Sequence, residues 1–235
     1  MHNDDLYHLD TLEKDYLPVL QEKCSLLIKM LEGKKILEVG CGTGNLLHLL
    51  STNDFELSGT DYSNDYLIKA RKKNPDIAFF QGDLTDIKSW EIYRNSYDSI
   101  ICSEVLEHIK DDLTALRIIL SLLKPNGVLI ITVPALNSLY SKFDKNVGHY
   151  RRYSMKSVCN IVNQAGFVIE KTRYWNFLGM FGWLFLFRLL KQDIKKTSHQ
   201  ILGSILGNWL KLESKIIFPL GQTIVIKARK LKTDD

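Results

Sequence analysis

One stretch of twelve residues, Lys34–Asn45, restricts the fold more than any other part of this chain. Its apolar run Ile36–Val39 predicts a short buried strand, and the mainly apolar run Leu46–Leu50 predicts a helix. Between the two runs lie three glycines with the spacing G-x-G-x-G. Such glycines allow the backbone to turn sharply and a ligand to approach the main chain. The stretch therefore predicts the first half of a nucleotide-binding βαβ unit.

The glycine spacing argues against two common nucleotide sites. Dinucleotide-binding folds use G-x-G-x-x-G, and a P-loop has a Lys followed by Ser or Thr, and neither pattern is present here. Nothing in the loop would neutralise a pyrophosphate or a triphosphate. Glu38 lies just before the loop, and its negative charge suits a cationic ligand.

Composition places the chain among ordinary globular proteins. Its 235 residues are 45% hydrophobic and 25% charged, which fits one large domain or one domain with an insertion. The net charge of +4 is too small to argue for nucleic acid. The scattered cysteines and the polar, acidic N-terminus favour a reduced cytoplasmic chain without a signal peptide.

Six further strands are expected after the glycine loop. They are Phe55–Thr60, Ile77–Phe80, Tyr97–Cys102, Val128–Val133, Phe167–Arg173 and Thr223–Lys230. A turn is expected at 124–127, and Ser63 and Ser154 are expected to cap helices that run to Lys73 and Ala165. Strands that alternate with helices predict an α/β fold with a doubly wound, mostly parallel sheet. Ligands of such sheets bind at the carboxyl ends of the strands.

The stretch around the glycines resembles motif I of class I S-adenosylmethionine-dependent methyltransferases, (I/L)LE(V/I)GCGTG. Further points of resemblance follow in the family's order, among them Asp61–Ser63, Gly82–Leu84 and the K-P-x-G-x-L-x-I-x-x-P pattern of Lys124–Pro134. The resemblance implies a seven-stranded Rossmann-like sheet whose last two strands form an antiparallel hairpin. It implies S-adenosylmethionine as the cofactor and S-adenosylhomocysteine as the product.

The resemblance also implies where the cofactor binds. Asp61 would hold the ribose, since one carboxylate can accept hydrogen bonds from both hydroxyls, and Tyr62 would lie against the adenine. Asp83 would accept a hydrogen bond from the adenine amino group, and Leu84 would contact the ring. The expected cofactor-binding residues are Glu38, Gly40, Cys41, Gly42, Gly44, Asp61, Tyr62, Asp83, Leu84 and Ser103.

An acidic stretch after the fourth strand is the first candidate for the chemistry. Glu104, Glu107 and His108 have the spacing that places side chains on one face of a helix, where they could bind a divalent ion. The pattern resembles the E-x-x-E-H site of quinone-biosynthesis O-methyltransferases and of small-RNA 2′-O-methyltransferases. The latter add a second histidine, for which His149 is the candidate. A divalent metal is possible but not expected, because the interpretation that these residues only shape the cleft is favoured; a further alternative is that His108 is a base.

A second candidate is Gly148–Ser154, in the loop after the fifth strand. Histidine ordinarily exchanges its proton near neutral pH, so His149 is the expected general base, with His108 and Glu104 as further catalytic candidates. Arg151 and Arg152 could bind a phosphate or carboxylate of the acceptor, or pair with Asp or Glu and pin the loop. The expected acceptor-binding residues are Tyr150, Arg151, Arg152 and Tyr153.

Three parts of one domain are expected. Residues 1–33 form a helical cap of two short helices separated at Pro18, 34–173 and 223–231 form the core, and 174–222 form a hydrophobic helical insertion. The first apolar run of the insertion is shorter than the roughly 20 residues of a spanning helix. The insertion could be a lid over an apolar acceptor, a peripheral membrane element or a dimer interface.

These patterns together predict O-methylation of a small-molecule, sugar or lipid-linked acceptor, in the cytoplasm or peripherally on a membrane. Two alternatives are an N-methyltransferase and a non-catalytic cofactor-binding subunit of a partner. A nucleic-acid substrate is not expected, because Cys102–Val105 stands where the N/D-P-P-Y/F motif would follow the fourth strand.

Overall fold

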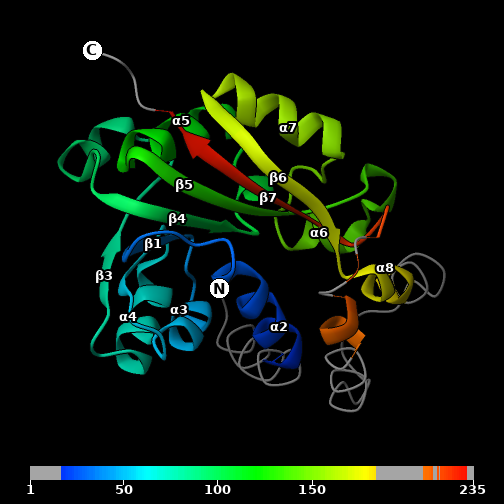
Figure 1. Ribbon diagram of the computed structural model, residues 1–235, viewed down its shortest axis with the longest axis horizontal. Helices are drawn as coiled ribbons and strands as arrows, with labels where there is room; N and C mark the ends of the chain where they lie inside the picture. The colour runs from blue at the N-terminus through cyan, green and yellow to red at the C-terminus, as the bar shows by residue number, and fades with distance from the viewer. Residues whose placement is uncertain (1–16, 184–208, 214–215, 217, 232–235) are drawn as a thin grey trace.

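The computed structural model describes residues 17–183, 209–213, 216 and 218–231 (Figure 1). In chain order, the elements up to the fourth strand are α2 (Leu17–Ile28), β1 (Lys35–Val39), α3 (Asn45–Leu50), β2 (Glu56–Asp61), α4 (Asn64–Lys73), β3 (Ala78–Gln81), η1 (Ile87–Tyr93) and β4 (Tyr97–Ser103). Those that follow are η2 (Leu106–His108), α5 (Asp112–Leu122), β5 (Leu123–Pro134), η3 (Asn137–Leu139), α6 (Lys142–Asn146), α7 (Met155–Gln164), β6 (Phe167–Trp175), α8 (Phe177–Trp183) and β7 (Thr223–Lys230).

The strands form one seven-stranded sheet in the order β3-β2-β1-β4-β5-β7-β6. The five strands β1 to β5 are parallel to one another, and β7 is antiparallel to both β5 and β6. This arrangement confirms the predicted doubly wound, mostly parallel sheet and the antiparallel pairing of the last two strands.

Helices cover both faces of the sheet, as Figure 1 shows, with α2, α3 and α4 on one side and α5 and α7 on the other. Alternation along β1 explains the two layers. Leu37 and Val39 pack with α5 and α7, whereas Ile36 packs with α2 and α3. All three side chains are fully buried, and truncating Leu37 to Ala would cost about 2–5 kcal/mol of stability.

The predicted N-terminal cap is described only in part. Helix α2 runs from Leu17 to Ile28, with Pro18 beside its first described residue. Whether a second helix precedes Pro18 stays a prediction. The part of the cap before Leu17 lies outside the described residues.

Two other predicted boundaries differ from those in the structure. The turn expected at 124–127 lies inside β5 as an irregularity, since Tyr97 pairs with Leu123 but Ser99 pairs with Val128. Strand β6 continues to Trp175, two residues into the expected insertion. The caps Ser63 and Ser154 are confirmed, each accepting a hydrogen bond from the backbone three residues further on.

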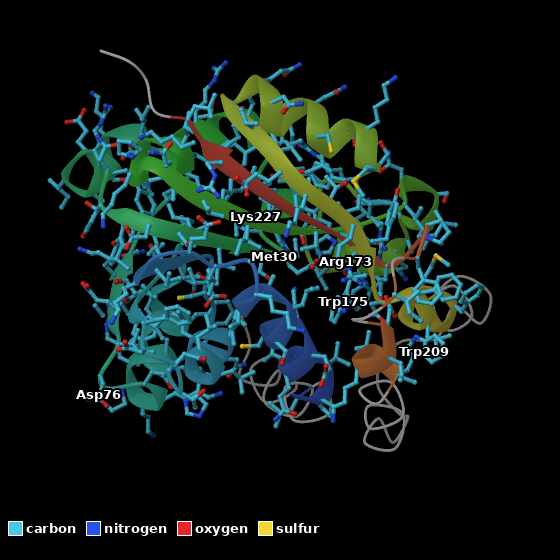
Figure 2. All side chains as sticks on the ribbon, in the orientation of Figure 1. Met30, Asp76, Arg173, Trp175, Trp209 and Lys227 are labelled. Carbon is cyan, nitrogen blue, oxygen red and sulfur yellow. The ribbon has the colours of Figure 1, made fainter. Side chains whose placement is uncertain are left out.

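The described part of the insertion comprises α8 and a short helical stretch at 209–213 with the residues that follow. The side chain of Arg173 at the end of β6 donates to the carbonyls of Glu213 and Ile216, and Figure 2 labels Arg173 and Trp209 in this region. The rest of the helix expected at 201–212 lies outside the described residues. Among the described helices, none combines the length and the hydropathy needed to cross a bilayer.

Candidate active site

The glycine loop has the backbone that its sequence predicts. Gly40, Gly42 and Gly44 have φ values of 68°, 53° and 75°, in the left-handed region that favours glycine. A Cβ added to Gly40 would lie 2.4 Å from Cγ2 of Val105, so the loop packs directly on the segment after β4. A Cβ on Gly42 would meet nothing within 4 Å. The backbone of Gly42 therefore borders open space where a ligand can approach.

Asp61 at the end of β2 closes this loop. Its Oδ2 accepts a hydrogen bond from the backbone N–H of Gly42 at 2.8 Å, and its Oδ1 accepts one from Ser63 N–H at 2.8 Å. Each carboxylate oxygen has a second lone pair, so Asp61 can still accept hydrogen bonds from two ribose hydroxyls. Tyr62 is 73% exposed next to it, a position from which its ring can cover a bound base.

Asp83 and Leu84 lie in the turn after β3. Asp83 Oδ1 accepts from Thr85 N–H at 2.8 Å, and the indole of Trp90 donates to the Asp83 carbonyl at 2.8 Å. Leu84 is buried against the core. These contacts fix the turn at the same edge of the sheet as Asp61, because β2 and β3 are parallel neighbours.

Glu38 is buried near the end of β1, two residues before Gly40. Its Oε2 is a buried oxygen without a hydrogen-bond partner among the described residues. Burial raises the pKa of Glu38 to about 8, an effect that Lys23 opposes and Asp61 reinforces. A buried carboxylate oxygen without a partner is costly. A positively charged ligand at this loop would offset that cost, so the site fits a sulfonium or ammonium group.

Two further predicted cofactor residues have structural contacts. Cys41 is buried, and burial with the nearby Glu38 raises the pKa of its thiol. Ser103 Oγ lies 3.0 Å from Thr132 Oγ1 on the neighbouring strand β5. Both residues stand at the carboxyl ends of strands, where the glycine loop and Asp61 also lie.

Glu104 is not on a helix face with Glu107 and His108, and that prediction is wrong. Glu104 has a φ of 55°, and only a short 3₁₀ turn, η2, follows it. Its carboxylate instead accepts hydrogen bonds from Lys23 of α2 at 3.2 Å and from Thr132 at 3.0 Å. Although burial raises the pKa of Glu104, these two donors lower it overall. Glu104 is thereby held as a carboxylate.

Glu107, His108 and His149 form a cluster whose candidate ligand atoms all lie within 4.8 Å of one another. The two imidazole rings stand edge to face, with centroids 4.6 Å apart and planes at 85°. Glu107 is 0% exposed, and neither of its oxygens has a partner among the described residues. Burial and the nearby Glu104 raise the pKa of Glu107, while burial and His149 lower the pKa of His108.

Backbone contacts bring this cluster together from two distant segments. The N–H of Tyr150 donates to the carbonyl of Glu107 at 2.8 Å, and Ala135 forms a parallel bridge with Tyr153. Because Gly40 packs on Val105, two residues before Glu107, the cofactor loop and the acid–histidine cluster are close neighbours.

The loop that carries His149 is pinned by ion pairs. Arg151 Nη1 donates to Asp112 at 2.7 Å, and Arg152 Nε donates to Asp144 at 2.7 Å. Tyr153 is buried, and its hydroxyl donates to Asp112 at 2.8 Å. Both arginines thus pair with aspartates and pin the loop, which was the second of the two predicted roles. Tyr150, in contrast, is exposed, and its contact with an acceptor stays a prediction.

Three residues of the site were not predicted from the sequence. Lys23, Asp112 and Asp144 each pair with a predicted residue, at separations of 81, 39 and 8 residues respectively. Asp144 had a local signal, because Ser141 and Asp144 form a capping box at the start of α6. Lys23 and Asp112 had none, since only the packing of helices on the sheet brings them to their partners.

Comparison with known proteins agrees with this geometry. A family model described as a methyltransferase domain matches residues 16–172. A ubiquinone biosynthesis O-methyltransferase of Actinobacillus pleuropneumoniae serotype 7 is 32% identical over 133 residues, covering 54% of each chain. This chain therefore spans about half the length of the curated relatives it matches. Solved structures share the fold, for example an S-adenosylmethionine-dependent methyltransferase of Archaeoglobus fulgidus.

The structural likeness is one of fold alone. The Archaeoglobus fulgidus structure has a TM-score of 0.64 at 18% identity, covering 94% of this chain and 99% of that one. The cyclase SpnF has a TM-score of 0.63 at 19% identity, covering 91% and 82%. The sheet order and the glycine loop are those of the class I methyltransferase fold. Within that class, the chain belongs to the family described by the methyltransferase domain model.

Proposed function

We propose that this protein transfers the methyl group of S-adenosylmethionine to a hydroxyl oxygen of a small-molecule, sugar or lipid-linked acceptor. The observation that carries the proposal is the position of His149 in the cluster with Glu107 and His108, directly beside the segment that the glycine loop contacts. A hydroxyl must lose a proton as it attacks the methyl group, and a base at this place would accept that proton. The similarity to a ubiquinone biosynthesis O-methyltransferase supports an oxygen acceptor.

Residues around the glycine loop would bind the cofactor. Asp61 would accept from the ribose hydroxyls, the backbone at Gly42 would lie against the ligand, and Glu38 would face positive charge. The bound cofactor supplies the reactive methyl group. The protein contributes orientation and the exclusion of water, which can lower the barrier of a substitution by several kcal/mol, up to about 7–11 kcal/mol in ideal cases.

Calorimetric titration with S-adenosylhomocysteine tests the cofactor site. We expect micromolar binding that Asp61→Ala abolishes. The matched control is Asp76→Ala, which removes an exposed carboxylate just before β3, labelled in Figure 2 at the edge of the molecule, and should leave binding unchanged. No binding by the unaltered protein would overturn the proposal.

The same cluster supports a divalent metal as an aid to deprotonation of the acceptor. Two imidazoles and one carboxylate are a donor set that suits ions such as Mn²⁺ or Fe²⁺, and the buried Glu107 lacks another partner among the described residues. A metal would lower the pKa of a bound hydroxyl. We expect calorimetry with Mn²⁺ to show one site that His108→Gln and Glu107→Gln each weaken. Equal binding by the variants would rule the cluster out as the metal site.

His149→Gln separates oxygen from nitrogen acceptors. A neutral amine is already a nucleophile and needs no strong base, whereas a hydroxyl does. Once an acceptor is found by screening phenolic and lipid-linked alcohols, we expect His149→Gln to lower kcat by about 10²–10⁴-fold without a matching loss of cofactor affinity. A loss of less than about tenfold would favour N-methylation.

The insertion supports an acceptor with an apolar part. Met180 of α8 and Leu139 of η3 share a small apolar cluster, with Leu136 and Phe143 packed against it. These residues lead into the loop that carries His149. Met180 and Leu139 are themselves buried in this contact, but Leu178 and Phe181 of α8 are exposed, and this apolar surface supports a lipid-linked acceptor.

A further inference from the structure

Asp144 receives more hydrogen bonds than a capping residue needs. Its side chain is 0% exposed. Oδ2 accepts from the backbone N–H of Ser141 at 2.8 Å and from Ser141 Oγ at 3.0 Å. Oδ1 accepts from Arg152 Nε at 2.7 Å and lies 3.1 Å from Nδ1 of His149. A buried carboxylate at the start of a five-residue helix is thus directed at the imidazole of the predicted base.

The partners of Asp144 determine which nitrogen of His149 carries the proton. Burial raises the pKa of the Asp144 carboxyl, but its hydrogen-bond partners and the charge of the buried, always charged Arg152 lower it overall. Asp144 is therefore a carboxylate, which can only accept hydrogen bonds. A 3.1 Å contact between two acceptors would be repulsive, so Nδ1 of His149 must be the donor.

The main chain of His149 is fixed by the same segment. Its N–H donates to the carbonyl of Asp144 at 2.8 Å, and its carbonyl accepts from the hydroxyl of Tyr140 at 2.8 Å. These contacts hold the main chain of His149 in place relative to Asp144. With Nδ1 engaged, the lone pair of neutral His149 lies on Nε2, the nitrogen on the opposite side of the ring.

We propose that Asp144 is a positioning residue that holds His149 in the Nδ1–H tautomer, so that Nε2 is the atom that takes the acceptor proton or binds a metal ion. The role in methyl transfer rests on the function proposed above, but the tautomer itself does not. Arg152 and Ser141 support this role of Asp144, because they hold its carboxylate in the orientation that faces the imidazole ring.

Nuclear magnetic resonance of the full-length protein labelled with ¹⁵N-histidine tests the tautomer directly. Measurements at about pH 8, where histidine is ordinarily neutral, in the presence of a chelator distinguish a protonated from a bare ring nitrogen. His149→Gln assigns the signals by removing them. We expect a protonated Nδ1 and a bare Nε2. An Nε2–H tautomer in the unaltered protein would overturn the proposal.

Two variants that each remove the carboxylate partner of an arginine show whether Asp144 is the cause. Asp144→Ala should let the His149 tautomers mix and, with an acceptor in hand, lower kcat on the order of 100-fold while KM for S-adenosylmethionine stays unchanged. Asp112→Ala is the matched control, since it also removes the carboxylate partner of an arginine, Arg151, but contacts no histidine by hydrogen bond. It should keep the Nδ1–H tautomer.

A retained Nδ1–H tautomer in Asp144→Ala would contradict the proposal. If that variant does not fold, the measurement on the unaltered protein still decides. Failure of the methyltransferase proposal would appear separately, as absent binding of S-adenosylhomocysteine, whatever the tautomer of His149.

Discussion

Lys23 Nζ lies 3.2 Å from Glu104 Oε1, and this ion pair joins α2 to the segment after β4 across 81 residues of chain. The same oxygen accepts from Thr132 on β5. Lys23 also lowers the pKa of Glu38 against the effect of burial. One lysine of the N-terminal helix thus offsets negative charge on both sides of the glycine loop, where β1 and β4 end side by side.

Lys23→Gln should destabilise the protein. The variant leaves Glu104 without its cation beside Glu107, and we expect a loss of about 1 kcal/mol, because the Glu104 side chain is 38% exposed and solvent screens the pair. The melting temperature should fall by roughly 2–4 °C. Lys29→Gln, an exposed lysine just after α2, is the control and should melt with the unaltered protein. Equal melting of both variants would show that the pair contributes nothing.

Two glycine variants should separate cofactor binding from folding. Gly42→Ala places a methyl group in open space at a φ of 53°, so it should cost only about 1–2 kcal/mol but abolish binding of S-adenosylhomocysteine. Gly40→Ala adds an overlap with Val105 to similar strain, and should cost about 1–3 kcal/mol more. Urea unfolding and calorimetry measure the two effects. Normal binding by Gly42→Ala would remove the loop from the cofactor site.

Glu32 should make stability dependent on acid pH. Hydrogen bonds from Arg229 and Lys227 lower its pKa from 4.5 to about 2. Because the folded pKa is the lower one, the contribution of Glu32 is complete above about pH 4.5 and is lost as the pH falls toward about 2. Urea unfolding should therefore show Glu32→Gln less stable than the unaltered protein near neutral pH, with the difference shrinking below about pH 4.

Glu91→Gln provides the control for this pH series, since Glu91 is an exposed side chain of η1. Its stability should follow that of the unaltered protein at every pH. If the difference in stability between Glu32→Gln and the unaltered protein stays constant from neutral to acid pH, the basic side chains of β7 do not keep the Glu32 carboxylate ionised.

The insertion should bind anionic vesicles. Leu178 and Phe181 of α8 are 37% and 48% exposed, and residues 176–222 contain six Lys or Arg and two Asp or Glu, a net charge of +4 that equals that of the whole chain. Apolar side chains among basic ones favour the surface of an anionic bilayer. We expect co-sedimentation with vesicles that contain phosphatidylglycerol, and less with phosphatidylcholine alone.

Leu178→Ser combined with Phe181→Ser should weaken this binding. Ile92→Ser is the matched control, because Ile92 is 82% exposed but lies on η1, outside the insertion. Absence of vesicle binding together with a dimer in analytical ultracentrifugation would instead assign the apolar surface to a second copy of the chain. If the protein neither binds vesicles nor forms a dimer, the interpretation of the insertion as a lid over the acceptor is favoured.

Local sequence was enough to predict the cofactor side of the site. Positive φ at Gly40 and Gly42, the cap at Ser63 and the strand ending at Asp61 are decided by residues within one or two turns of each position. The acceptor side could be predicted only in part. Spacing put Glu104 on a helix with His108, but the left-handed backbone at Glu104 turns the chain before the helical turn begins.

The sequence by itself determined the order of strands and helices, the glycine loop and the residue types at the carboxyl ends of the strands, because hydrophobic period and turn chemistry are local properties. Only the tertiary structure decided which charges meet. Lys23 reaches Glu104, and His149 reaches His108, because parallel packing of β1, β4 and β5 and the return of the loop to η2 bring distant segments to one edge. Burial at that edge makes an unpaired polar group costly, and proximity in space decides which partner each paired group has.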